Sequence, residues 1–411
     1  MNNSMPINLK SGTSKLEFNM YTSLMHAMAV GEFHGSLKKS RIGRRYKKIQ
    51  DEVVRSILLS KIHHLKEKPI PENMLSSLDK IFTSHWIDED TIITGGKDNK
   101  LIIWDLSEPL ITSREIKLPS GISEMPLDNC GIHSITASPM NNYLATGAQN
   151  PSELAIFSIP DMKPRALLTG HKDWTFDCCW LSENDIVSVS RDKGLCMWNT
   201  SNISADSPSL SILTPSHSIK AHSRKVRKVK TNLTRCKLAT LSADATMKIW
   251  DAPRLHCLST SFLPETQELV CLEWNFETNC ILIGSQSGIQ MIDPSSNKLV
   301  LNLNSMGSDW GIRSLSSNQN RVTIGTGIGK LYFYDLRKMC FEKTREQQPT
   351  PLFLQGTKAY LKRDMFYERY FSGFDIPQAI YTHEYSPSGT RLFTAGGPLI
   401  FGLTGAYAAL W

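Results

Sequence analysis

Short apolar runs recur along the chain, and most of them end on an aromatic residue followed by Asp or Asn. Seven runs share this general form: Leu101–Asp105, Leu154–Phe157, Leu195–Asn199, Met247–Asp251, Ile289–Asp293, Leu331–Asp335 and Ala408–Trp411. Each has the length of a β-strand, and three of the six intervals between their closing residues are 41 or 42 residues. A period of ~40–45 residues with a terminal Trp-Asp pair is typical of β-propellers with four-stranded blades. The pattern predicts an all-β fold, a seven-bladed WD-repeat β-propeller.

The repeats place the propeller at residues 79–411, with an incomplete last blade. That blade begins near Ala379, and the chain stops at Trp411 on its third strand. Because an open sheet edge invites aggregation, we expect a strand from residues 65–77 to complete it. The long interval before the last run predicts an insertion at about residues 341–375, whose aromatic stretch Met365–Phe371 folds onto the ring. The Ser-rich stretch Ser201–Ser218 indicates a loop.

Two repeats carry polar residues that can tie the turns of a blade to its strands. His, Asp, Ser and Trp can join in a hydrogen-bonded chain, and such a network fixes one register when it is buried and satisfied. The expected structural residues are His171, Ser190, Asp192 and Trp198 in one blade and His222, Ser242, Asp244 and Trp250 in the next. We interpret both sets as parts of the fold, although they superficially resemble a catalytic triad.

The segment before the propeller combines a basic arm with an amphipathic helix. Residues 1–48 are predicted to be a disordered arm, in which Ser36–Lys48 holds seven Lys and Arg residues and accounts for the net charge of +7. Residues 49–78 are predicted to hold a helix followed by the ring-closing strand. The helix is marked by apolar residues at helical spacing: Ile49, Val53, Val54, Ile57, Leu58, Ile62 and Leu65. Its apolar stripe packs either on the chain's own blades or in the groove of a partner, and the arm is either a solvated tail or a segment for nuclear import or an acidic partner.

Composition fits a globular protein without a membrane segment. Charged residues make up 21% of the 411 residues and hydrophobic residues 40%, and no apolar run approaches the ~18 residues of a membrane span. Nine Cys without a C-x-x-C pair indicate reduced thiols, which favours the cytoplasm and nucleus. We expect no metal, no cofactor and no catalytic centre, because no nucleophile and base share a motif outside the two structural sets.

An alignment of the first strands of the blades brings basic residues to one level of the ring. The aligned positions are Ile132, Phe176, Val226 and Ile312, and the residues just after them are His133, Asp177, Arg227 and Arg313. Lys225 lies just before one of them, and counting back seven residues from the closing aromatic adds Lys97 and Arg191. In a WD propeller these positions lie on one face near the central channel. The alternative is charge scattered over the surface.

The predicted binding site is therefore a mouth lined by six residues: Lys97, His133, Arg191, Lys225, Arg227 and Arg313. Guanidinium and ammonium groups suit carboxylates or phosphates. The limited width of such a mouth favours a chain end over a duplex. A peptide C-terminus with acidic side chains brings up to three carboxylates in two residues.

Several motifs resemble those of one known family, the cullin-4-associated factor twelve proteins. They are Cys130–His133, Leu144–Gly147, Gly170–Trp174, Ser190–Asp192, Gly311–Ser314, Val322–Gly327, Ala395–Pro398, Gly402–Leu403 and Tyr407–Trp411. The similarity runs from about Ser36 to Trp411. It implies a WD-repeat substrate receptor of the cullin-4–RING E3 ubiquitin ligase, a non-catalytic subunit that recruits proteins ending in paired acidic residues, typically Glu-Glu.

The resemblance also implies roles for individual residues. The six residues of the predicted mouth match the family's pocket for acidic ends. The N-terminal helix, with Val53, Val54, Ile57 and Leu58, would dock on the ligase's triple-propeller adaptor. A Trp-Asp-x-Arg box would also contact the adaptor; Tyr334–Arg337 keeps its Asp and Arg, whereas Ile292–Ser295 lacks the Arg and Trp250–Arg254 displaces it. Arg337 is therefore the candidate residue of that box.

A second hypothesis comes from the basic arm alone. A scaffold that binds nucleic acid or acidic lipid through Ser36–Lys48 would lose affinity steeply with salt. The receptor hypothesis predicts instead that there is no membrane and no specific nucleic-acid partner. Deletion of residues 1–48 separates the two, because only the second hypothesis predicts loss of binding.

Overall fold

A computed structural model of the chain describes residue 62 and residues 65–107, 110–121, 130–203, 210–263, 268–304, 311–344 and 349–411. The chain divides into two compact units, residues 1–66 and 67–411. The predicted basic arm and nearly all of the predicted N-terminal helix lie outside the described residues. In the part of the chain that the structure describes, no helix is long and apolar enough to cross a membrane.

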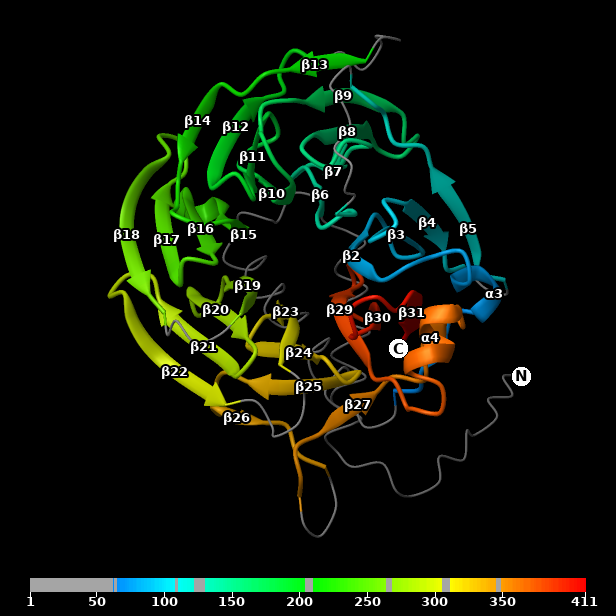
Figure 1. The fold of residues 1–411 in the computed structure, drawn as a ribbon. Helices are drawn as coiled ribbons and strands as arrows, with labels where there is room; N and C mark the ends of the chain where they lie inside the picture. Colours follow the sequence, from blue (N-terminus) through cyan, green and yellow to red (C-terminus); the bar gives the residue numbers. More distant parts are fainter. Residues whose placement is uncertain are drawn as a thin grey trace, which may run out of the picture. The chain divides into compact units, whose positions relative to one another are not determined.

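The second unit is a seven-bladed β-propeller, as the repeats predict (Figure 1). Each blade is built on an antiparallel sheet whose first strand lies nearest the central axis, and blade two carries one further, parallel strand at its outer edge. Blade one consists of β2 (Ile81–Trp86), β3 (Thr91–Gly96), β4 (Leu101–Asp105) and β5 (Thr112–Ile116). Blade two consists of β6 (Ile135–Ala137), β7 (Tyr143–Gly147), β8 (Leu154–Ser158), β9 (Pro164–Leu168) and β13 (Ser211–Leu213). Blade three consists of β10 (Thr175–Trp180), β11 (Asp185–Ser190), β12 (Gly194–Asn199) and β14 (His217–Lys220).

The remaining blades follow in chain order. Blade four consists of β15 (Val226–Asn232), β16 (Lys237–Ser242), β17 (Thr246–Asp251) and β18 (His256–Phe262), with the 3-10 helix η3 (Leu233–Arg235) between its first two strands. Blade five consists of β19 (Leu269–Asn275), β20 (Cys280–Ser285), β21 (Gly288–Asp293) and β22 (Lys298–Asn304). Blade six consists of β23 (Ile312–Asn318), β24 (Arg321–Thr326), β25 (Lys330–Asp335), β26 (Cys340–Phe341) and β27 (Phe353–Gln355). Blade seven consists of β29 (Gln378–Tyr385), β30 (Leu392–Pro398) and β31 (Gly405–Leu410), with β1 (Lys68–Pro69) and β28 (Tyr360–Leu361) at its outer edge.

Apolar side chains between neighbouring blades form the core. The middle strands are almost fully buried, as in β8 and β30, because each blade packs a face on each of its neighbours. The closing residues of the repeats supply the bulk: Trp104, Phe157 and Trp198 are completely buried. The repeat marks that reveal the blades in the sequence are thus the residues that hold the blades together.

Two short strands at the outer edge of blade seven close the ring. β1 pairs antiparallel with β31, with Lys68 opposite Leu410 and Pro69 opposite Ala409, within the segment 65–77 for which a closing strand is expected. Ile70 and Leu75 then bury their side chains in one apolar cluster with Phe393. β28 pairs with the other half of β31. The outer edge of blade seven is therefore paired with two short strands, β1 at the start of this unit and β28 in the insertion.

The insertion contacts two blades. β27 extends the edge of blade six by pairing with β25, and β28 extends blade seven. The aromatic stretch forms a short helix, α4 (Met365–Tyr370), which begins at Asp364, whose carboxylate accepts the N–H of Tyr367. The expectation of a loop at Ser201–Ser218 was incomplete, since β13 runs parallel to β9 and β14 begins at His217. The two parallel strands are some 45 residues apart in the chain, so no local sequence pattern indicates that they pair.

The polar sets of blades three and four form networks, but with different hydroxyl groups from those predicted. His171 Nδ1 lies 3.0 Å from Asp192 Oδ2, and His171 Nε2 lies 2.7 Å from Ser188 Oγ. In blade four the equivalent distances from His222 are 3.1 Å to Asp244 and 2.8 Å to Thr240. Thr240 also accepts the N–H of Trp250 at 2.9 Å.

Ser190 and Ser242 take part in these networks through the backbone of the aspartates, and their hydroxyls do not reach the imidazoles. Both are the last residues of their strands, and both hydroxyls accept the backbone N–H of the Asp two residues later. The hydroxyl two residues earlier in the strand is the one that reaches the imidazole. Trp198 contacts His171 ring edge to ring face at 5.6 Å, and its N–H has no hydrogen-bond partner among the described residues.

Candidate functional site

The predicted basic residues lie at one edge of blades one, two, three, four and six. In an antiparallel meander, the start of the first strand and the end of the second strand lie at the same edge. Backbone hydrogen bonds join these two points, from Lys97 N to Lys80 O and from Arg191 N to Trp174 O, each at 2.8 Å, and from Ala243 N to Lys225 O at 3.0 Å. The sequence positions of Lys97, Arg191 and Lys225 are therefore on one face of the propeller.

A β-bulge in the first strand of six blades selects the residues that meet around the axis. The register against the second strand shifts there by one residue; the extra residue follows the first paired residue in five of these blades and the third in blade seven. In blade two the pairing begins only at Ile135, and His133 takes the equivalent place by its ring contacts. We call these seven residues the bulge ring: Phe82, His133, Phe176, Arg227, Val270, Arg313 and Tyr381.

The bulge corrects the alignment made from the sequence. Phe176 is the bulged residue of blade three and is equivalent to His133 and Arg227, whereas Thr175 is the residue equivalent to Val226. Asp177 therefore lies one position farther along, where its carboxylate accepts the backbone N–H of Val229 at 2.9 Å. Thr175 is polar, unlike Val226 and Ile312, so an alignment on apolar residues selects Phe176 instead.

Four successive blades contribute aromatic rings to the bulge ring. Phe82 stacks on His133 with ring centroids 4.7 Å apart and contacts Tyr381 edge-on at 5.5 Å. His133 contacts Phe176 edge-on at 5.4 Å, and the guanidinium of Arg227 lies 5.8 Å from the centroid of Phe176. These contacts link blade seven to blade four through blades one, two and three. Phe82 and Tyr381 were not predicted as site residues, because they carry no charge and do not close a repeat.

Basic residues of blades three and four lie close to one another on this face. Burial lowers the pKa of Lys225, and the positive charges of Arg227 and Arg191 lower it further. The side chain of Arg191 is 48% exposed and lies over Trp174, with its guanidinium carbon 4.6 Å from the ring centroid. Lys97, on blade one, is partly exposed. We call Lys97, Arg191 and Lys225 the rim cations.

His133 differs from the prediction that it supplies a positive charge. Burial lowers the pKa of His133 to about 3, with further contributions from the charges of Lys228 and Arg227. Its imidazole is therefore neutral at physiological pH and belongs to the aromatic half of the ring. Arg313, in blade six, lies near enough to Tyr381 for its charge to act on that phenol, whose pKa burial raises to about 12.

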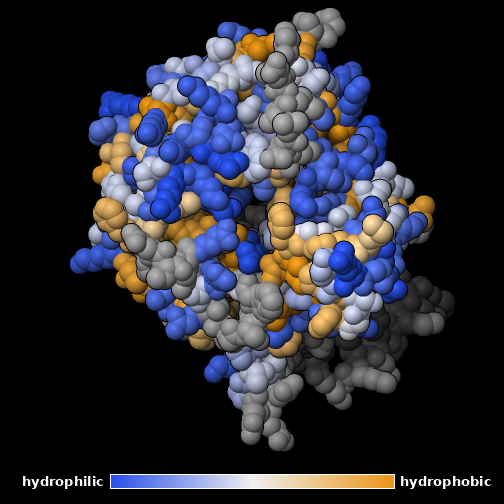
Figure 2. Space-filling model, in the orientation of Figure 1, coloured by the Kyte–Doolittle hydropathy of each residue, from blue (hydrophilic) through white to orange (hydrophobic). Residues whose placement is uncertain are grey.

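Charged residues farther along the first strands are paired with one another. Lys230 Nζ lies 3.3 Å from Glu273, and His85 Nδ1 lies 3.1 Å from Glu384. The negative charge of Glu273 raises the pKa of Lys230 against the effect of its burial. A space-filling view shows a hollow at the centre of the ring, bordered largely by hydrophilic residues (Figure 2). Among the described residues, no group of three or more His, Cys, Asp or Glu is placed to hold a metal ion.

The residues expected to contact an adaptor lie elsewhere. Val53, Val54, Ile57 and Leu58 are outside the described residues. Arg337 follows the third strand of blade six, which ends at the opposite edge of the blade from the mouth. It is exposed, and its backbone N–H donates to Asp335 at 2.8 Å.

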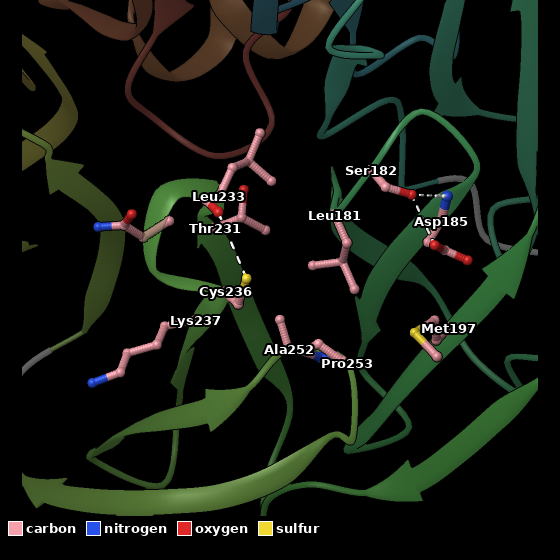
Figure 3. A pocket seen from close by; sticks show the side chains of 11 residues that line it. Leu181, Ser182, Asp185, Met197, Thr231, Leu233, Cys236, Lys237, Ala252 and Pro253 are labelled. Atoms are coloured by element: carbon pink, nitrogen blue, oxygen red, sulfur yellow. Dashed lines mark hydrogen bonds between the residues drawn. The ribbon is translucent and has the colours of Figure 1, made fainter.

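A pocket of about 330 Å³ opens at that same opposite edge, between blades three and four (Figure 3). The turn Leu181–Asp185, the residues around Cys236 and Pro253 surround it, with largely apolar walls. The Cys236 thiol contacts the carbonyl of Leu233 at 3.9 Å, and Ser182 donates to Asp185 at 2.8 Å. The pocket holds none of the predicted site residues.

Comparison with known proteins agrees with this architecture. The sequence model of the family described as "DDB1- and CUL4-associated factor 12 beta propeller" matches residues 64–411. The chain belongs to this family. The matched region covers the whole propeller, including β1 and the insertion that completes blade seven.

A curated relative shares a shorter stretch. Protein HIR1 of Eremothecium gossypii is 30% identical over 137 residues, which covers 28% of this chain and 17% of that protein. The chain thus spans less than a fifth of the length of this relative.

Proposed function

We propose that this chain is a non-catalytic substrate receptor of a cullin-4–DDB1 ubiquitin ligase, and that its mouth binds proteins that end in paired acidic residues. Membership of the family supports the receptor role. The bulge ring and the rim cations support the acidic ligand. The proposal places substrate-binding roles on Lys97, Arg191, Lys225, Arg227 and Arg313, with neutral His133 as part of the aromatic wall.

The observation that carries this proposal is the convergence of Arg191, Lys225 and Arg227. They come from two neighbouring blades, and burial together with the charges of Arg227 and Arg191 lowers the pKa of Lys225. Like charges at one opening do not stabilise a fold. Arg191 and Arg227 each have one carboxylate of the chain beside them, and a ligand that brings several negative charges can contact all three cations at once.

A chain ending in Glu-Glu carries such charges on two side chains and on its terminus. Each hydrogen bond between charged partners contributes about 1.5–3 kcal/mol, so a few of them suffice for a micromolar complex. The aromatic half of the bulge ring lies on the other side. A narrow mouth admits a chain end and excludes a duplex.

The adaptor is proposed to bind the opposite end of the propeller. The exposed Arg337 lies there, and the N-terminal helix with Val53, Val54, Ile57 and Leu58 supplies the second contact. Substrate and adaptor would then occupy opposite faces, as a receptor requires.

Peptide titration tests the ligand. We expect a labelled peptide ending in Glu-Glu to bind the full chain, the same peptide with an amidated end to bind about tenfold more weakly because one carboxylate is lost, and a peptide ending in Lys-Lys not to bind. Equal affinities for the three peptides would contradict the proposal. Co-purification with DDB1, with and without residues 36–65, tests the adaptor contact independently.

A further inference from the structure

Three cations of the mouth are already paired with carboxylates of the chain itself. Lys97 Nζ lies 3.0 Å from Asp79, and Arg191 Nε lies 3.7 Å from Asp173. The guanidinium of Arg227 forms a hydrogen bond with Glu268. The negative charge of Glu268 also acts on Lys225.

The three carboxylates occupy the same place in the fold. Asp79 and Asp173 precede the first strands of blades one and three by two residues, and Glu268 directly precedes the first strand of blade five. These segments lead to the bulge ring from the face that carries the rim cations. The carboxylates are therefore positioned against the same groups that an acidic ligand would contact.

Glu268 differs from the two aspartates in how firmly it is held. Asp79 also accepts the backbone N–H of Lys80 at 2.8 Å, and Asp173 accepts that of Trp174 at 2.8 Å. Glu268, with a side chain 55% exposed, has Arg227 as its only hydrogen-bond partner among the described residues. Its carboxylate can leave the mouth by side-chain rotation, without loss of a backbone contact.

We infer that Glu268 is an internal competitor that occupies Arg227 until an acidic chain end displaces it. This inference rests on the proposed function, because it concerns the same mouth. A single carboxylate that replaces Glu268 only exchanges one ion pair for another. A chain end with several carboxylates also reaches Lys225 and Arg191, and that additional contact favours displacement. Glu268 thereby sets the preference of the mouth for multiply charged ends.

Replacement of Glu268 by Gln tests the inference in the full chain. The variant should bind the Glu-Glu peptide about two- to fivefold more tightly, which is the range expected from release of one exposed ion pair. It should also narrow the difference in affinity between the Glu-Glu peptide and its amidated form. The matched control is Glu277→Gln, which makes the same change of charge in blade five, in the exposed turn between β19 and β20 at the opposite edge. That control should leave the peptide affinity unchanged.

A double variant separates competition from general electrostatics. In an Arg227→Gln background, the further change Glu268→Gln should have little effect on affinity, because Arg227 is the group that Glu268 occupies. Equal thermal unfolding temperatures for Glu268→Gln and Glu277→Gln would show that the fold is intact. If Glu268→Gln lowers stability, the shorter Glu268→Asp serves in its place, with the same expected direction.

Failure of the competitor role and failure of the proposed function give different experimental results. If the wild-type chain binds the Glu-Glu peptide and Glu268→Gln binds it equally or more weakly, the competitor role is overturned and the receptor proposal stands. If neither protein binds the peptide, both proposals fall. Tighter binding by Glu268→Gln that persists in the Arg227→Gln background would also overturn the inference.

Discussion

The two halves of the bulge ring occupy equivalent backbone positions and carry different chemistry. Blades seven, one, two and three place Tyr381, Phe82, His133 and Phe176 there, and each of these rings contacts the next. Blades four and six place Arg227 and Arg313 at the same bulge, with Val270 between them. The aromatic half is held together by its own packing. In the other half, Arg227 is held by the side chains of Glu268 and Phe176, and Glu268 is exchangeable.

This difference shows how a repeat fold can build an asymmetric site from one repeated backbone feature. The bulge fixes where a side chain points, and the residue type in each blade decides what that side chain does. We expect changes in the cationic half to alter ligand affinity and changes in the aromatic half to alter stability. Substitutions in each half test that division.

Charge reversal at Arg227 should have the largest effect. Arg227→Glu removes a charge-assisted contact and sets a second carboxylate beside Glu268, so we expect the affinity for a Glu-Glu peptide to fall by about 100-fold or more. Fluorescence anisotropy measures the loss. The control Arg337→Glu, at the opposite edge of the propeller, should keep the peptide affinity and weaken capture of DDB1. If Arg227→Glu binds the peptide as tightly as the wild type does, the cationic half is not part of the binding site.

Removal of a ring from the aromatic half should act mainly on stability. Phe82 contacts both His133 and Tyr381 and is partly buried, so Phe82→Ala should lower the free energy of unfolding by about 2 kcal/mol, less than for a fully buried Phe. Chemical denaturation followed by Trp fluorescence measures this change. Phe276→Ala, at a ring that is 64% exposed, should have almost no effect. A similar loss at both positions would contradict the role of ring packing.

Acid should lower the stability of the fold through protonation of His133, which lies in the aromatic half of the bulge ring. The pKa of His133 is about 3 in the folded chain and about 6.5 when unfolded. Between these values the unfolded chain binds a proton that the folded chain does not, so stability is lost as the pH falls from about 6.5 towards 3. His133→Phe keeps a ring and removes the titrating group. We expect this variant to lose about 2 kcal/mol less stability than the wild type between pH 7 and pH 5; an identical acid response in both would contradict the assignment.

Loss of the contact between Phe176 and Arg227, which joins the two halves, should have the smallest effect, and that effect is on peptide affinity. Phe176 lies under the guanidinium of Arg227, and an exposed cation–π contact contributes about 0.5–1 kcal/mol. Phe176→Leu should therefore weaken peptide binding by about two- to fivefold, which titration can resolve. A loss as large as that of Arg227→Glu would show that the two halves do not act separately.

Much of the fold and part of the site could be predicted from the sequence. The aromatic residues that close the repeats, such as Trp104 and Trp198, mark the blades because they are large, apolar and regularly spaced. The basic residues Arg227 and Arg313 were placed correctly on the first strands, since their neighbours Val226 and Ile312 are apolar and begin those strands. Phe176 was misplaced by one residue, because its neighbour Thr175, which is equivalent to Val226 and Ile312, is polar and an alignment on apolar residues passes over it.

The number of blades, the incomplete last blade and the expected level of the basic residues in the ring can all be predicted from the sequence. These follow from periodicity, which is a property of the chain alone. Only the tertiary structure decided that the mouth has an aromatic half, that His133 is neutral and that Glu268 occupies Arg227. Each depends on contacts between residues some 40 or more positions apart, and such contacts exist only once the blades are closed into a ring.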